Sequence, residues 1–230
     1  MFFDLGYTLV FTEREEGFLN HLKAHNITKE KEEVVHAFHL ADKYFMREFP
    51  GLLGKSRDNY MTQYRAYLLE RLQLSDVPAF SPSKNPKQKR GWKCFPFTHH
   101  TLQALRDMGY TLGLISNWND TAHAVLEENN LTQYFQSITI SSELGIEKPD
   151  SRIFEAALNN TGFKGDECLY VGDNYYDDVV GARTVSMDSV LINPYGKLGI
   201  EELDSSVRVI NSIEVLPSLL KRVENNESRN

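Results

Sequence analysis

The chain opens with Met1-Phe2-Phe3-Asp4-Leu5-Gly6-Tyr7-Thr8-Leu9, a very short apolar run that ends on an aspartate. A buried strand followed directly by a carboxylate is typical of the carboxyl end of a strand in an open α/β sheet, where ligands bind. A central strand normally has about 5 residues, so we expect the natural chain to begin a few residues upstream of Met1. Asp4 is the first candidate for a functional residue.

The C-terminal part of the chain alternates short apolar runs with helical patterns. The segment 151–161, for example, carries apolar residues at helical spacing, with Asp150 or Ser151 as its cap and Gly162 at its end. The alternation predicts βαβ units with right-handed crossovers. We therefore expect an α/β fold, a Rossmann-like three-layer core built on a parallel sheet. The runs expected to form its buried strands, beside the first, are 110–115, 137–140, 168–171, 189–192 and 207–210.

Residues 13–76 carry long helical patterns with many charges and no strand signal, which predicts an all-helical cap inserted after the first strand. Residues 77–93 are rich in proline and lysine. We interpret them as a solvated linker rather than an anion-binding or nucleic-acid-binding patch, because proline-rich polar runs are usually connections. The core would then comprise residues 1–12 and 94–230, with a disordered polar tail at 225–230.

Composition narrows the class of protein. The 230 residues carry a formal net charge of −7, whereas a surface that tracks nucleic-acid phosphates needs a basic excess. No apolar run approaches the roughly 20 residues that span a bilayer. Cys94 and Cys168 match neither a zinc spacing nor a disulfide framework, which favours a reducing compartment. We expect a cytoplasmic protein without nucleic-acid or membrane partners; its oligomeric state cannot be read from the sequence.

Polar residues follow four of the predicted strands, either directly or on the loop after the strand. Because the carboxyl ends of parallel strands meet at one edge of a sheet, these side chains should converge. One such residue could be accidental, but four groups at four strand ends indicate a site. The groups are Asp4; Ser116 with Asn117; Lys148 with Asp150; and Asp173 with Asp177 and Asp178.

Three of these residues, Asp4, Asp173 and Asp178, are carboxylates that would repel one another in a dry cleft. A divalent cation between them would remove that repulsion. Carboxylate oxygens, backbone carbonyls and water are the ligands that suit Mg²⁺. The sequence therefore predicts Mg²⁺ as the cofactor.

The other groups complete a site for phosphoryl chemistry. Ser116 and Asn117 offer hydrogen-bond donors to phosphoryl oxygens, and Lys148 offers a fixed positive charge. The carboxylate of Asp4 can itself attack phosphorus and form an aspartyl-phosphate, while the metal and the lysine absorb negative charge. Nucleophile, metal ligands, donors and cation are all present.

These motifs, in this order, resemble those of the haloacid dehalogenase superfamily. Residues 3–9 resemble the first motif, 114–117 the second, 147–150 the third and 171–178 the fourth. The helical insertion after the first motif matches the subclass with an α-helical cap. The resemblance covers nearly the whole chain apart from the linker and the tail.

The resemblance implies roles for the metal-binding residues. Asp4 would be both nucleophile and metal ligand, and Gly6 would bind the metal through its backbone carbonyl. Asp173 would be a further ligand. Asp178 would be either a ligand or a residue that orients the ligands.

The resemblance also implies a set of residues around the transferring group. Thr8 would steady the nucleophile loop, and Ser116 and Lys148 would bind the group. Asn117 would bind phosphate through its backbone N–H or simply end the strand. Asp177 falls beside the motif position, so we expect a solvated surface carboxylate.

One position departs from the family pattern. Phosphatases of the superfamily carry a second aspartate two residues after the nucleophile, a general acid and then base, and here that residue is Gly6. Losing a positioned acid–base group typically costs about 10²–10⁴-fold in rate. We therefore expect a Mg²⁺-dependent phosphatase of small phosphorylated metabolites that is slow, or that acts on good leaving groups such as acyl and aryl phosphates.

Two alternatives stay open. The first is a metal-independent 2-haloacid dehalogenase, because dehalogenases also lack the second aspartate; the pair Asp173 and Asp178 speaks against it, since carboxylates beside Asp4 need a cation. The second is a catalytically weak member of the superfamily that binds a phosphorylated ligand or a protein, which Gly6 favours.

Overall fold

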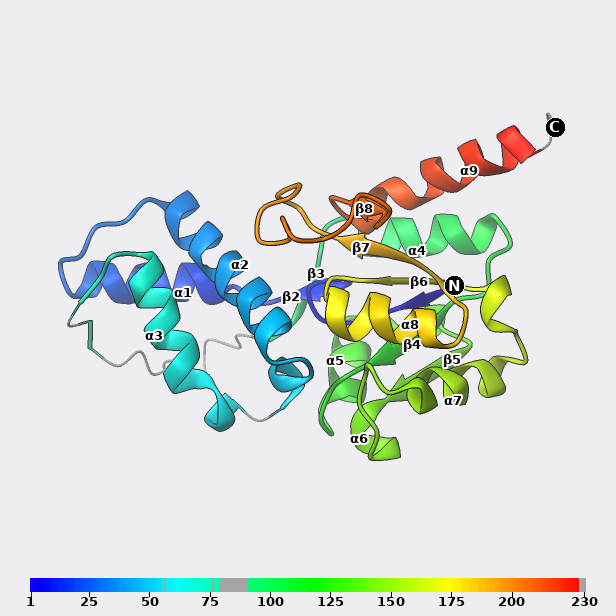
Figure 1. The fold of residues 1–230 in the computed structure, drawn as a ribbon, viewed down its shortest axis with the longest axis horizontal. Coiled ribbons are helices and arrows are strands. Elements are labelled where there is room, and N and C mark those ends of the chain that lie inside the picture. Colours follow the sequence, from blue (N-terminus) through cyan, green and yellow to red (C-terminus); the bar gives the residue numbers. More distant parts are fainter. Residues whose placement is uncertain (56, 76, 79–90, 228–230) are drawn as a thin grey trace. The chain divides into compact units, whose positions relative to one another are not determined.

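The computed structural model describes residues 1–230 except 56, 76, 79–90 and 228–230 (Figure 1). The chain divides into two compact units, one of Met1–Phe11 with Trp92–Asn230 and one of Thr12–Gly91. We call the first the core and the second the helical unit. Most of the predicted linker and the end of the predicted tail lie outside the described residues.

In the described part of the core, six parallel strands form a sheet of order β5-β4-β1-β6-β7-β8. The shortest, β1, lies at its centre, where Phe2 pairs with Gly113 on one side and Tyr170 on the other. The predicted α/β, Rossmann-like fold class is confirmed. The strands are β1 (Phe2–Phe3), β4 (Gly113–Ser116), β5 (Ser137–Ile140), β6 (Leu169–Gly172), β7 (Asp188–Ile192) and β8 (Val209–Ile210).

Helices cover both faces of this sheet, which gives three layers (Figure 1). Phe3 on β1 packs with residues of α4, α5 and α9, whereas its neighbour Phe2 packs with residues of α7 and α8. Successive strand residues point to opposite faces, so both faces of β1 are apolar. The helices are α4 (Thr98–Asp107), α5 (Ala122–Glu128), α6 (Ser141–Leu144), α7 (Ser151–Thr161), α8 (Val180–Thr184) and α9 (Leu216–Glu227).

Local signals placed some element ends correctly. The side chain of Asp150 accepts a hydrogen bond from the Arg152 backbone N–H and caps α7, which ends at Gly162 in the left-handed conformation, φ 75°. The antiparallel pair β2 (Val10–Phe11) and β3 (Lys93–Cys94) was not predicted. Two residues are too few to show a strand period, and β3 falls at the end of the predicted linker.

The described part of the helical unit contains α1 (Arg14–Ala24), α2 (Lys31–Glu48) and α3 (Met61–Arg71) around their own apolar cluster. Tyr60 and Tyr64 are buried in that cluster. The Tyr64 hydroxyl donates to Asp42, which also pairs with Arg14. Short turns complete the chain: 3-10 helices at Leu52–Gly54, Arg57–Asn59, Thr132–Tyr134, Gly165–Glu167 and Ile213–Val215, and a π-helix at Tyr175–Val179.

Across the described ranges, the helices lack the combination of length and apolar composition that crossing a membrane requires.

We predict that Phe3→Ala lowers the free energy of unfolding of the core by about 3–5 kcal/mol, the usual cost of removing a buried phenyl group. Phe3 is 0% exposed and lies in the central strand. Urea unfolding followed by tryptophan fluorescence measures this, because both tryptophans of the chain, Trp92 and Trp118, belong to the core. Phe163→Ala is the control, since Phe163 is 39% exposed. Equal losses for the two variants would show that β1 is not the centre of the core.

Candidate active site

The loop after β1 carries Asp4 in a tight turn. The backbone N–H of Asp4 continues the sheet by donating to the Val171 carbonyl at 2.9 Å. Tyr7 adopts the left-handed conformation, φ 52°, and its N–H donates to the Val10 carbonyl at 2.7 Å. Leu5 and Leu9 are both fully buried in the core cluster and anchor the turn there. Asp4 is thus held at the carboxyl end of the central strand with little freedom to move.

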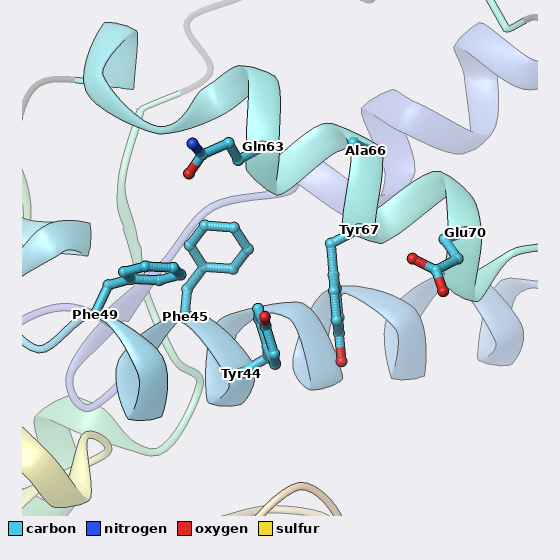
Figure 2. Close-up of a pocket in the computed structure, with 7 residues that line it drawn as sticks. All are labelled: Tyr44, Phe45, Phe49, Gln63, Ala66, Tyr67 and Glu70. Carbon is cyan, nitrogen blue, oxygen red and sulfur yellow. The ribbon is translucent and has the colours of Figure 1, made fainter.

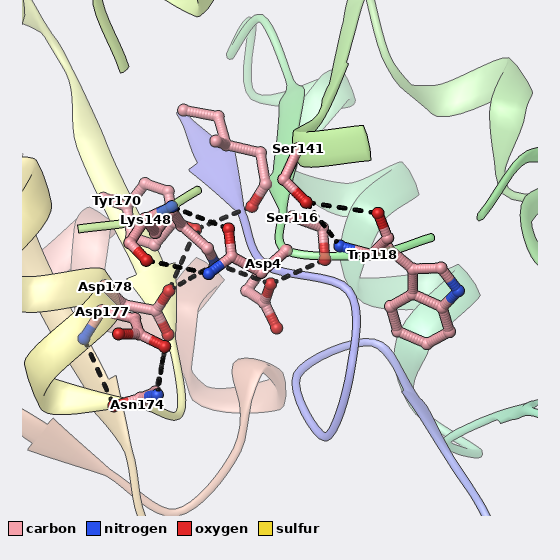
Figure 3. A network of polar contacts seen from close by, with 11 residues as sticks. Asp4, Ser116, Trp118, Ser141, Lys148, Tyr170, Asn174, Asp177 and Asp178 are labelled. Atoms are coloured by element: carbon pink, nitrogen blue, oxygen red, sulfur yellow. Dashed lines mark hydrogen bonds and ion pairs between the residues drawn. The ribbon is translucent and has the colours of Figure 1, made fainter. Parts of the chain in front are cut away.

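Lys148 joins the third motif to the first and the fourth (Figure 3). Its Nζ donates to Asp4 Oδ1 at 2.8 Å, Asp178 Oδ1 at 2.6 Å and the Tyr170 hydroxyl at 2.9 Å. Burial acts to lower the pKa of Lys148, but Asp178 and Asp4 outweigh it and raise that pKa well above its ordinary value. Lys148 is therefore a cation at neutral pH, although it is almost fully buried.

Asp4 has two unlike oxygens. Oδ1 accepts hydrogen bonds from Ser116 Oγ at 2.9 Å and from Lys148 Nζ. Oδ2 has no hydrogen-bond partner in the described part of the chain, so it is available to a substrate or a metal. Burial raises the pKa of Asp4, Lys148 opposes the rise and Asp178 adds to it. A further cation at this point would stabilise the ionised, nucleophilic form.

Both oxygens of Asp178 already accept hydrogen bonds. Oδ2 accepts from the Asn174 backbone N–H at 2.9 Å, while Oδ1 accepts from Lys148 and lies 3.2 Å from the Tyr170 hydroxyl. A Cβ atom at Gly172 would lie 2.1 Å from Asp178 Oδ2, so this strand end requires glycine. Through these contacts Asp178 fixes the position of the Lys148 ammonium group.

Asp177 corrects a prediction. Expected on the surface, it is 6% exposed and accepts a hydrogen bond from Asn174 Nδ2 at 2.8 Å. Asp177 is buried because it lies in the first turn of the π-helix that begins after Asn174. The side-chain oxygen of Asn174 caps this helix by accepting hydrogen bonds from the backbone N–H groups of Tyr176 and Asp177. This cap draws the first turn inward, and π-turns occur frequently at functional sites. Asn174 was the sequence signal, and its capping role was missed.

The acidic cluster fits a divalent cation. Asp4, Asp173 and Asp178 each offer a carboxylate oxygen, and these atoms lie within 4.8 Å of one another. Lys148 supplies the opposing positive charge that contacts two of them. Three carboxylates and one ammonium group leave an excess of negative charge in a largely buried site. A metal ion bound by the carboxylate oxygens would offset that excess.

The remaining predicted residues lie beside this cluster. Ser116 contacts Asp4 directly, as described above. Thr8, in the nucleophile loop, is buried, and within the described ranges its Oγ1 has no hydrogen-bond partner. Asn117 uses its side chain rather than only its backbone: Nδ2 donates to the Lys148 carbonyl at 2.9 Å, and Oδ1 accepts from the Lys148 N–H at 2.7 Å. These two hydrogen bonds fix the second motif to the third.

Tyr170 is a site residue that the sequence analysis missed. It is fully buried on β6, contacts Lys148 and Asp178, and donates to the Ile115 carbonyl at 2.8 Å. A tyrosine inside a predicted buried strand was the available signal, because a buried hydroxyl needs partners.

Gly6 lies against two tryptophan rings. A Cβ atom added there would lie 3.2 Å from Trp118 Cζ3 and 3.7 Å from Trp92 Cη2. The position of the missing acid is therefore crowded, and even alanine requires a small shift of Trp118.

A pocket of the helical unit is separate from these residues. Its volume is about 340 Å³, and its one charged lining residue is acidic, which does not suit a phosphate (Figure 2). The lining residues are Tyr44, Phe45, Phe49, Gln63, Ala66, Tyr67 and Glu70.

The fold and the four strand-end motifs define a hydrolase of the haloacid dehalogenase type. A family model for haloacid dehalogenase-like hydrolases matches residues 2–192, and the chain belongs to this family. The resemblance drawn from the motifs is confirmed.

Comparison with individual proteins adds detail. The chain is 29% identical over 228 residues to haloacid dehalogenase-like hydrolase domain-containing protein 3 of Mus musculus, covering 94% of this chain and 88% of that protein. It is 33% identical over 136 residues to glyceraldehyde 3-phosphate phosphatase of Methanothermobacter thermautotrophicus, but that match spans only 55% of this chain and 58% of the relative.

Solved structures confirm the fold. A phosphatase from Thermococcus onnurineus superposes with a TM-score of 0.59 at 23% identity, covering 95% of this chain and 96% of that one. A dehalogenase superposes with a TM-score of 0.62 at 22% identity, covering 95% of both. Because both activities occur on this fold, the choice between them rests on the site.

We predict that Tyr170→Phe lowers the free energy of unfolding of the core by about 1–3 kcal/mol, since the buried Ile115 carbonyl and Lys148 ammonium each lose one hydrogen-bond partner. Urea unfolding measures the change. Tyr134→Phe is the matched control, because the Tyr134 hydroxyl contacts only the half-buried His99 ring in the described chain. A Tyr170→Phe variant as stable as the control would contradict the network around Lys148.

Proposed function

We propose that the protein is a Mg²⁺-dependent phosphatase of small phosphorylated molecules that forms an aspartyl-phosphate on Asp4. The observation that carries the proposal is the asymmetry of the Asp4 carboxylate. Ser116 and Lys148 hold Oδ1, while Oδ2 is available, in a cluster with more carboxylate than ammonium charge. A held nucleophile with one free oxygen suits in-line attack on phosphorus.

In the first step, Asp4 Oδ2 attacks phosphorus and forms a P–O bond. The bond from phosphorus to the leaving oxygen breaks, and its electron pair departs with that oxygen. Lys148, fixed by Asp178 and Tyr170, offsets negative charge near the reacting group, and Ser116 keeps the carboxylate oriented. In the second step, water attacks phosphorus, the electron pair of the Asp4–phosphorus bond returns to the carboxylate, and the protons of the water pass to phosphate and solvent.

The residues that would hold Mg²⁺ are Asp4 and Asp173, the backbone carbonyl of Gly6, and Asp178 either as a ligand or as an orienting group. When bound, the ion would neutralise phosphoryl oxygens as charge develops on them. Thr8 and Asn117 would complete the phosphate site from the nucleophile loop and the end of β4.

The comparisons support phosphoryl chemistry over the alternatives. The relative from Methanothermobacter thermautotrophicus is named as a glyceraldehyde 3-phosphate phosphatase, although the match spans just over half of it. The carboxylate cluster also argues against a metal-free dehalogenase, because Lys148 supplies one positive charge to a cluster of three carboxylates. The substrate class is therefore a phosphate ester or anhydride.

We predict Mg²⁺-dependent release of phosphate from acetyl phosphate, lost on the order of 10⁴-fold or more in Asp4→Asn. EDTA should abolish the activity, and Mg²⁺ should restore it. Asp188→Asn is the matched control, because Asp188 is exposed at the amino end of β7, the edge of the sheet opposite Asp4. Release of chloride from a 2-chloroacid in EDTA would instead establish the dehalogenase. Metal binding without any turnover would leave a ligand-binding member of the family.

We predict that Gly6→Asp hydrolyses alkyl phosphates at least about tenfold faster than Gly6→Ala, because a positioned acid usually contributes about 10²–10⁴-fold. Gly6→Ala is the matched control, since both variants place a Cβ atom 3.2 Å from Trp118 and only one adds a carboxyl group. Steady-state phosphate release measures both. Equal rates would show that proton transfer at this position does not limit turnover.

A further inference from the structure

Three aromatic rings surround the nucleophile loop and have no role in the steps above. The Trp92 and Trp118 rings lie 4.7 Å apart between centroids and are tilted by 59°. The Tyr7 ring meets Trp92 edge-on at 5.4 Å. We call Tyr7, Trp92 and Trp118 the aromatic wall. Both tryptophans are half-buried: they pack against the core cluster, and part of each side chain is exposed.

The aromatic wall lies at the reacting end of the sheet. Trp118 follows Ser116 and Asn117 at the carboxyl end of β4, and both indole rings lie within 4 Å of a Cβ atom built on Gly6. Gly6 is two residues from Asp4 in the tight nucleophile loop. The rings thus occupy the space into which a side chain at position 6 would extend.

The ring of Trp118 and the backbone of Trp92 contact the two residues that flank α5. The Trp118 indole Nε1 donates to Thr121 Oγ1 at 3.0 Å, immediately before the helix. At its other end, Asn129 Nδ2 donates to the Trp92 carbonyl at 3.0 Å. The Trp118 backbone N–H also donates to Ser141 Oγ at 3.0 Å. A Trp118 ring fixed before a ligand arrives loses little entropy on binding it, which makes this part of the wall a preorganised surface.

From these contacts we infer that the aromatic wall binds the leaving group, so that the substrate class is the phosphate ester of a planar aromatic alcohol. This inference rests on the proposed phosphatase function. Two independent features lead to the same class: the ring faces suit a flat apolar group, and Gly6 offers no acid to protonate a departing oxygen.

The chemistry of departure agrees with this class. A phenol has a pKa of about 10, as in tyrosine, whereas the pKa of an alkyl alcohol is far higher and closer to that of water. When Asp4 Oδ2 bonds to phosphorus, the P–O bond to the aromatic group breaks and its electron pair leaves as a phenolate. The phenolate takes its proton from solvent afterwards, so no side-chain acid is needed.

Binding of inert analogues tests the inference without turnover. We expect phenylphosphonate, in the presence of Mg²⁺, to bind about three- to tenfold more tightly than methylphosphonate, the gain typical of one aromatic contact. Phenylphosphonate should also change the tryptophan emission, because both tryptophans of the chain lie in the wall. Trp118→Leu should remove the preference, Trp118→Phe should keep it, and Phe163→Leu, on the exposed surface, should not alter it. Trp92→Leu provides a second test should Trp118→Leu fail to fold.

The outcomes separate this inference from the proposed function. Equal affinities for the two phosphonates, together with Asp4-dependent hydrolysis of acetyl phosphate, would overturn the aromatic class and leave the phosphatase standing. A phenylphosphonate preference that depends on Trp118, without hydrolysis of any phosphate, would uphold the wall as an aromatic ligand site and overturn the phosphatase. A preference that survives both Trp118→Leu and Trp92→Leu would place the aromatic group elsewhere and refute the inference.

Discussion

The buried ammonium of Lys148 is the interaction on which the rest of the site depends. It contacts carboxylates from two different motifs, Asp4 and Asp178, at 2.8 and 2.6 Å. Removing one partner of such a buried ion pair leaves the other charge buried without compensation, which lowers the free energy of unfolding by about 3–5 kcal/mol. The side chains around it are fixed for that reason. Tyr170 accepts a further hydrogen bond from Lys148, and the backbone N–H of Asn174 donates one to Asp178.

The fold brings these residues together with short segments of chain. β1 has two residues yet pairs with strands on both sides, so Asp4 emerges at the centre of the sheet. Asn117 fastens the loop of Lys148 to the end of β4 through two hydrogen bonds. Gly172 allows Asp178 to lie directly over β6. The strand pairing of β1 and the hydrogen bonds of Asn117 join different motifs, which is why the motifs converge although they are far apart in the sequence.

Much of this could be predicted from the sequence, because strand-end position alone brings Asp4, Ser116, Lys148 and Asp178 to one edge. What could not be predicted depends on details below that level. Asp177 points inward because of a π-turn, which has no periodic signature. Tyr170 reads as an ordinary strand residue until its partners are known. Trp92 comes from the predicted linker, so its approach to Gly6 depends on tertiary structure rather than on any local pattern.

Covalent phosphorylation of Asp4 distinguishes the proposed mechanism from every alternative, and the aspartyl-phosphate can be trapped chemically. The protein would be incubated with acetyl phosphate and Mg²⁺, quenched in acid and reduced with borohydride, which converts an aspartyl-phosphate to homoserine. Mass spectrometry of the N-terminal peptide would then locate the change. We expect homoserine at position 4, dependent on Mg²⁺ and absent after Asp4→Asn. Sustained turnover with position 4 unmodified, or with the label on another carboxylate, would contradict it.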